Sequence, residues 1–322
     1  MTHLRLEFLG RMQVIVSEQP IVTFPYEKVK ALFAYLATES NYPHHRDTLA
    51  AMFWADQCES KARSNLRKAL SVLRHLLGDG IHSPLFLTTR NTIQLSFDNT
   101  HHTLDIARLT QLLERHPQPS KQSDAVRPEH ISDLEQAVGL YRGPFLDRMQ
   151  LPCSESFESW LMLNRERFHQ LVVDACITLI AYYEHQQDEQ KVKQYTEKQL
   201  QLEPWNEIAH QRLMQLLVRQ GQRTAALRQY DRCCKVLEQQ LATEPEPATI
   251  ALGEAIRSGS FPNSMQANAN ALRLSSKPVV LNSPARELTC VKSNSLPASA
   301  TSLVSRKQNA LRTSCFKRPT YS

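Results

Sequence analysis

The chain has 322 residues, of which 41% are hydrophobic and 22% charged, and a formal net charge of +6. This composition is ordinary for a globular protein, and the length allows two modest domains and a tail. No stretch approaches the roughly 20 apolar residues that a membrane span requires, and the first residues lack the apolar core of a secretory signal. We therefore expect a cytoplasmic protein that does not contact a membrane.

The positive charge lies mainly in the C-terminal tail. Residues 260–322 contain nine Lys or Arg and one acid, whereas residues 1–259 contain 29 basic and 31 acidic residues. Overall basicity therefore does not indicate nucleic-acid binding, and such binding must depend on a local basic surface.

The cysteines exclude a disulfide framework or a zinc knuckle. Their number is odd, they are scattered, and none are spaced as C-x-x-C. We expect reduced thiols that mostly contribute to packing. The seven are Cys58, Cys153, Cys176, Cys233, Cys234, Cys290 and Cys315.

The N-terminal residues alternate between apolar and polar. Leu4, Leu6 and Phe8 predict one face of a strand, and residues 12–16 and 21–24 predict two further short strands. Pro25 then breaks the pattern. The segment therefore predicts a small three-stranded sheet.

Three helices and a hairpin follow. The apolar spacing predicts a helix from residue 27 that ends near residues 40–43, and further helices over residues 46–54 and 60–77, the last of which should end at Gly78. Residues 85–88 and 92–96 predict a β-hairpin with Arg90 at its tip. Strands, three helices and a terminal hairpin in this order predict a winged helix-turn-helix domain over residues 1–97.

The helix over residues 60–77 is the candidate recognition helix. Its apolar residues form one stripe, while the opposite face is basic, with Glu59 as the one nearby acid. We expect Ser64, Arg67, Lys68 and Ser71 to lie in or near the major groove, because arginine, lysine and serine suit base edges and phosphates. A solvated helix face is the structural alternative. The remaining predicted DNA-binding residues, which would mostly hold the DNA backbone, are Arg46, Lys61, Arg63, Arg74 and Arg90.

Residues 98–258 predict an all-α domain. The helical segments are 104–116, 131–141, 157–185, 190–202, 205–220, 223–241 and 248–257, with a loop over 117–128. Two Glu-Pro pairs, at 203–204 and 244–245, precede helices 41 residues apart, and this interval is typical of a degenerate tetratricopeptide-like array. Residues 259–322 are rich in serine and predict a disordered tail. The fold class is therefore mainly α with a small β component.

Several motifs resemble those of SARP-type bacterial transcriptional regulators, which join an OmpR-like winged helix to a bacterial transcriptional activation domain. The motifs are LEFLG at 6–10, KALFAYLA at 30–37, RDTLA at 46–50 followed by Phe53-Trp54, ARSNLRKALSVLR at 62–74, YRGPFL at 141–146 and LEP at 202–204. The match covers residues 4–257. It departs from the pattern at Ala55, where the family often has proline, and the tail matches nothing in the family.

The resemblance implies a transcriptional activator that binds repeated promoter elements as paired protomers. It also implies that the helical domain contacts a neighbouring protomer or RNA polymerase. Larger relatives continue into an ATP-binding module, but no G-x-x-x-x-G-K-[ST] motif occurs in this chain.

An enzyme is not predicted, because no nucleophile motif and no cofactor-binding motif is present. The pairs His44-His45 and His101-His102 do not have the spacing of metal ligands on a helix, so we expect neither a metal nor a cofactor. The competing function is a repeat scaffold that binds a protein partner and does not read DNA. The basic helix face between Lys61 and Arg74 favours double-stranded DNA as the partner.

Overall fold

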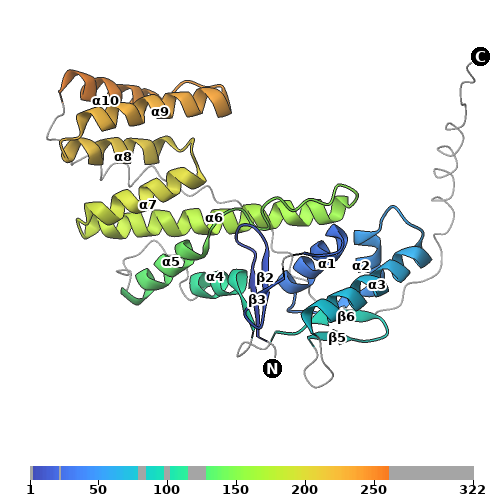
Figure 1. Cartoon of the computed structure of the whole chain (residues 1–322). Coiled ribbons are helices and arrows are strands. Elements are labelled where there is room, and N and C mark those ends of the chain that lie inside the picture. The colour runs from blue at the N-terminus through green and yellow to red at the C-terminus, as the bar shows by residue number, and fades with distance from the viewer. Residues whose placement is uncertain (1–2, 22, 79–84, 98–101, 115–127, 261–322) are drawn as a thin grey trace, which may run out of the picture. The chain divides into compact units, whose positions relative to one another are not determined.

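The computed structural model of the chain describes residues 3–21, 23–78, 85–97, 102–114 and 128–260 (Figure 1). The described residues form one compact unit, and helix dominates, as the mainly α prediction requires. The predicted loop lies outside the described residues except for Pro128, and the predicted tail lies outside them except for Gly259 and Ser260.

The N-terminal sheet has four strands in the order β3-β2-β1-β7. β1 (Leu4–Glu7) pairs antiparallel with β2 (Gln13–Val16) and parallel with β7 (His102–Leu104). The alternation of Leu4 and Leu6 arises because both side chains face the core, where they are 3% and 1% exposed. β7 was not predicted, because three residues ahead of a helix have no pattern of their own.

The third predicted strand, at residues 21–24, is wrong in position. Ser17 and Glu18 both adopt positive φ, at 47° and 67°, which makes a tight two-residue hairpin turn. The turn brings β3 (Gln19–Pro20) against the end of β2. The third strand therefore lies closer to the N-terminus than the hydrophobic residues at 21–24 suggested.

The next elements form the predicted winged helix-turn-helix. They are α1 (Glu27–Thr38), β4 (His44–His45), α2 (Arg46–Phe53), α3 (Glu59–Leu77), β5 (Phe86–Thr88) and β6 (Thr92–Leu95). A second sheet has the order β4-β6-β5, so the hairpin is attached to the short strand that leads into α2. α3 ends where predicted, at Gly78, whose φ of 63° is the left-handed conformation that glycine adopts without strain.

In the part of the chain that the structure describes, seven helices follow, one in each predicted helical segment. They are α4 (Asp105–Glu114), α5 (Pro128–Leu140), α6 (Glu155–His185), α7 (Glu189–Leu202), α8 (Glu207–Arg219), α9 (Arg223–Leu241) and α10 (Pro247–Ser258). Side chains of Ser154, Asp188 and Asn206 cap α6, α7 and α8. Consecutive helices from α6 to α10 pack in chain order (Figure 1). Within the described residues, no helix is long and apolar enough to cross a membrane.

The first strand is joined tightly to the helical part of the chain. The carboxylate of Asp105 accepts hydrogen bonds from the backbone N–H groups of Phe8 and Leu9, at 2.8–2.9 Å. Arg142 Nη2 lies 2.9 Å from Asp105 and 3.1 Å from Glu7. Burial raises the pKa of Asp105, although the two amides and Arg142 act in the opposite direction.

One hydrophobic core therefore runs across the predicted domain boundary at residue 97. It contains Leu6 of β1, Leu73 of α3 and Leu179 of α6 alike. On the α2 side, the hydroxyl of Ser154 donates to the carbonyl of Met52. The division into residues 1–97 and 98–258 stays a prediction about folding units, since the two parts share a sheet and a core.

Candidate nucleic-acid interface

The candidate recognition helix, α3, is fixed by one buried side. Leu66 and Leu73 are 1% and 0% exposed, and α3 packs against both α1 and α2. Burial of each such leucine stabilises the folded state by roughly 1.5–3 kcal/mol. The buried residues of α3 are Ala62, Leu66, Ala69, Leu70, Leu73 and Leu77. The opposite side is thereby held outward.

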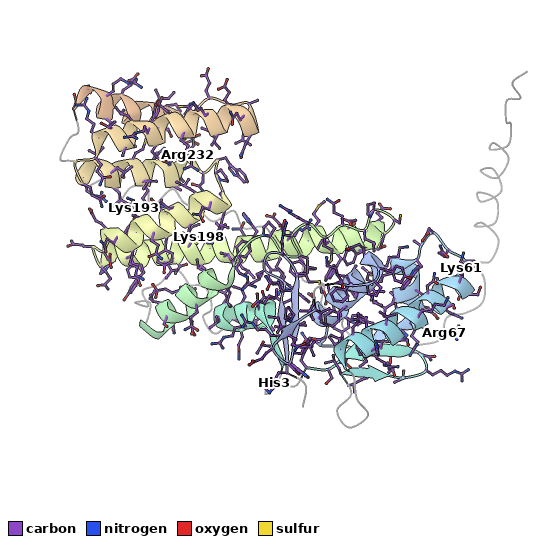
Figure 2. All side chains as sticks on the ribbon, viewed as in Figure 1. His3, Lys61, Arg67, Lys193, Lys198 and Arg232 are labelled. Atoms are coloured by element: carbon purple, nitrogen blue, oxygen red, sulfur yellow. The ribbon has the colours of Figure 1, made fainter. Side chains whose placement is uncertain are left out.

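The outward face of α3 carries the residues predicted to enter the major groove. Arg67, Lys68 and Ser71 are exposed, and Ser64 is half-buried. Figure 2 shows Lys61 and Arg67 directed away from the body of the protein. The side chains of Arg67 and Lys68 have no hydrogen bond or ion pair with any described residue. Their charges are available to an external partner.

Three of the arginines that were predicted to contact the DNA backbone have hydrogen-bond partners within the protein. Arg63 Nε lies 2.7 Å from Asp47 Oδ1 on α2, and Arg63 Nη2 lies 2.7 Å from Glu59 Oε1. The hydrogen bond to Asp47 is the main reason that the pKa of Arg63 is raised. Arg63 therefore links α2 to α3, and its role on DNA stays a prediction.

The other two engaged arginines hold the hairpin. Arg74 Nη2 donates to Thr88 Oγ1 at 2.9 Å. Arg46 Nε donates to the carbonyl of Thr89 at 3.2 Å, and the Arg46 backbone N–H donates to Asn91 at 2.9 Å. These contacts tie α2, α3 and the hairpin into one surface. Sequence reasoning assigned the arginines to phosphates and missed their protein partners.

The tip of the hairpin carries Arg90, as predicted. The hydroxyl of Thr89 accepts hydrogen bonds from the backbone N–H groups of Asn91 and Thr92, at 3.2 and 2.9 Å, which is a turn that serine and threonine favour. Arg90 is exposed at this turn, and its side chain makes no hydrogen bond or ion pair with a described residue. The wing thus adds a second cationic position beside α3.

Of the two histidine pairs, the structure describes His44, His45 and His102. His44 is buried, its Nε2 lies 2.8 Å from the carbonyl oxygen of Glu39, and its ring packs against Tyr35. His101 lies outside the described residues. In the described part of the chain, no group of three His, Cys, Asp or Glu side chains is arranged to hold a metal ion.

Comparison with known proteins agrees with this architecture. Residues 104–257 match the family model of the bacterial transcriptional activator domain. One similar solved structure is Mycobacterium tuberculosis EmbR in complex with a low-affinity phosphopeptide, with a TM-score of 0.55 and 20% sequence identity over 85% of this chain and 70% of that chain. This likeness shows the fold. No curated protein matches the chain.

The matched segment begins at β7 and ends in α10, so it includes every helix from α4 to α10. The winged helix-turn-helix precedes it in the chain. The domain match supports the identification of the chain as a transcriptional regulator of the SARP type, and the likeness to EmbR agrees with its fold.

Proposed function

We propose that this regulator binds duplex DNA in a sequence-specific manner, with α3 in the major groove and the β5–β6 hairpin on the adjacent backbone. The observation that carries the proposal is the outward face of α3, where Arg67 and Lys68 are exposed beside Ser71 without a partner among the described residues. Arginine and lysine in this position suit guanine edges and phosphates. The ion pair of Arg63 with Asp47 supports the same role, because it links α3 to α2.

The residues divide into two groups by role. Ser64, Arg67, Lys68 and Ser71 read base edges, whereas Lys61 and Arg90 contact phosphates. Arg46, Arg63 and Arg74 can add phosphate contacts through their remaining N–H groups, although each also positions a neighbouring element. Residues 1–97 form the DNA-binding unit in this proposal, and residues 98–258 the activation unit.

The chain acts in the cytoplasm as an activator without enzymatic activity. Because one recognition helix reads only a few base pairs, two protomers bind repeated elements side by side. The helical domain contacts the neighbouring protomer or RNA polymerase. The domain match to a bacterial transcriptional activator family supports this assignment.

The test is selection of bound duplexes from a random DNA pool by the full chain at moderate salt, with the Arg67→Ala/Lys68→Ala variant as control. We expect an enriched motif that occurs twice in each selected duplex and disappears in the control. Deleting one copy should then abolish the complex that contains two protomers in a gel-shift measurement. No enrichment from folded protein would reject DNA reading and favour a protein-binding scaffold.

A further inference from the structure

A second basic surface lies on α9, outside the candidate nucleic-acid interface. Helices α8 to α10, all of whose residues the structure describes, contain seven Lys or Arg. Four of them have a partner: Arg212 pairs with Glu184, Arg219 with Glu189, Arg223 donates to the carbonyl of Ile256, and Arg257 lies over the ring of Tyr230. Local partners therefore account for most of the positive charge in this part of the protein.

The remaining three cations are exposed on one face of α9. Arg228, Arg232 and Lys235 have no hydrogen bond or ion pair with any residue that the structure describes. They line a shallow cleft of about 430 Å³, and Figure 2 shows Arg232 on this helix. Asp231 is the one acid in the lining. Three positive charges against one negative charge leave the cleft basic.

The cleft is not uniformly polar. Its lining also contains Val236, which is half-buried, and Gln239. The six lining residues recur at helical spacing between 228 and 239, so the face extends along three turns, or roughly 16 Å. An apolar position beside cations suits a helix that presents both carboxylates and an apolar side chain, because protein interfaces combine both kinds of contact.

We infer that this face of α9 is a docking surface for an acidic amphipathic helix of a partner protein. Carboxylates on the partner helix pair with Arg228, Arg232 and Lys235, and an apolar side chain covers Val236. Duplex DNA is the less suitable occupant, since its backbone offers phosphates but no apolar group to contact Val236. This surface is separate from α3 and goes beyond the proposed DNA binding.

The probe is a fluorescein-labelled 12-residue peptide with glutamates at positions 1, 5 and 8 and leucines beside them, measured by fluorescence anisotropy with the full chain. A peptide of the same composition in scrambled order is the control probe. We expect saturable binding of the first peptide, falling steeply with salt. The variant R228E/R232E/K235E should lose about tenfold or more in affinity. The variant R228Q/R232Q/K235Q, which removes the charges but keeps polar side chains, should also lose affinity for the peptide.

A crossed design separates this inference from the proposed function. The variant R67E/K68E on α3 should lose binding to a selected duplex but still bind the peptide. The α9 variants should lose binding to the peptide but still bind the duplex. Equal binding of the scrambled peptide would overturn the inference, as would unchanged affinity in both α9 variants. Displacement of the peptide from R67E/K68E by duplex DNA, which should no longer bind at α3 in that variant, would show that the α9 face binds phosphates instead.

Discussion

The two basic helices, α3 and α9, have the same length but different surroundings. Each has 19 residues and one buried apolar side. The outward face of α3 places cations beside Ser64 and Ser71, and the hairpin with Arg90 lies next to it. The cations of α9 lie beside Val236 and Gln239, and α9 packs against α8 and α10.

This difference shows why the number of positive charges does not identify the partner. Cations beside hydroxyl groups and a cationic hairpin suit the polar groove and backbone of a duplex. Cations beside an apolar side chain suit a protein surface. The neutral residues between the charges therefore distinguish the two faces.

The largest expected effect is on the buried side that holds each helix in place. Leu73→Ala in α3 and Leu237→Ala in α9 should each lower the free energy of unfolding by about 2–5 kcal/mol, because both side chains are almost fully buried. Urea unfolding measures this. Lys61→Ala and Lys235→Ala, at exposed positions of the same helices, should remain within about 0.5 kcal/mol of the parent. A loss of less than about 0.5 kcal/mol in the free energy of unfolding of either leucine variant would contradict the packing of the helix that carries that leucine.

The next effect separates base reading from charge. Arg67→Ala should cost about 1–3 kcal/mol at one base position and relax the preference there, because a bidentate contact to a guanine is lost. Competition binding with single-base variants of the selected duplex measures this. Arg228→Ala on α9 is the matched control and should leave the preference unchanged. An equal loss of affinity for all duplexes would instead indicate that Arg67 contacts the DNA phosphates.

A smaller effect is expected at the phosphate contacts. Lys61→Ala and Arg90→Ala should weaken all duplexes alike, and each should reduce the slope of log affinity against log salt by about 1. Salt titrations of the parent and the two variants measure the slope. Arg148→Ala removes a cation that is 73% exposed but lies far along the chain from α3, and it should leave the slope unchanged. A sequence-dependent loss in Arg90→Ala would indicate that the hairpin also reads the groove.

The sequence was sufficient for features that depend on neighbouring residues. The buried stripe of α3, its end at Gly78 and the seven later helices follow from spacing within a few turns. The ion pair of Arg63 with Glu59 could also be predicted from sequence, because residues four apart on a helix lie side by side. Its pairing with Asp47 was not, since it depends on the angle between α2 and α3.

Contacts between distant segments were beyond prediction for the same reason. Asp105 accepts the Phe8 amide from 97 residues away, and nothing in either local sequence specifies the other. β7 exists only because β1 lies beside it, and β3 is placed by two residues with positive φ rather than by hydrophobic alternation. For the candidate interface, sequence predicted which arginines lie near α3 but not which of them have protein partners.

The last prediction tests whether the charge of Arg232 is unpaired, as the α9 docking surface requires. His210 lies buried near α9, where its Nδ1 is 2.6 Å from Gln229 Nε2 and its Nε2 is 2.8 Å from the carbonyl oxygen of Pro204. A neutral ring satisfies both contacts, by accepting at Nδ1 and donating at Nε2. Burial is the main cause that lowers the pKa of His210, and the charge of Arg232 lowers it further.

Because the pKa of His210 is lower in the folded than in the unfolded protein, its stabilising contribution is present above about pH 6.5. That contribution is lost as the pH falls through the folded-state pKa, since the unfolded protein binds the proton first. We expect an NMR titration to place the His210 pKa below the usual value and to raise it in Arg232→Gln. An unchanged pKa in Arg232→Gln would show that the charge of Arg232 does not act on His210, and this support for an unpaired charge on α9 would be lost.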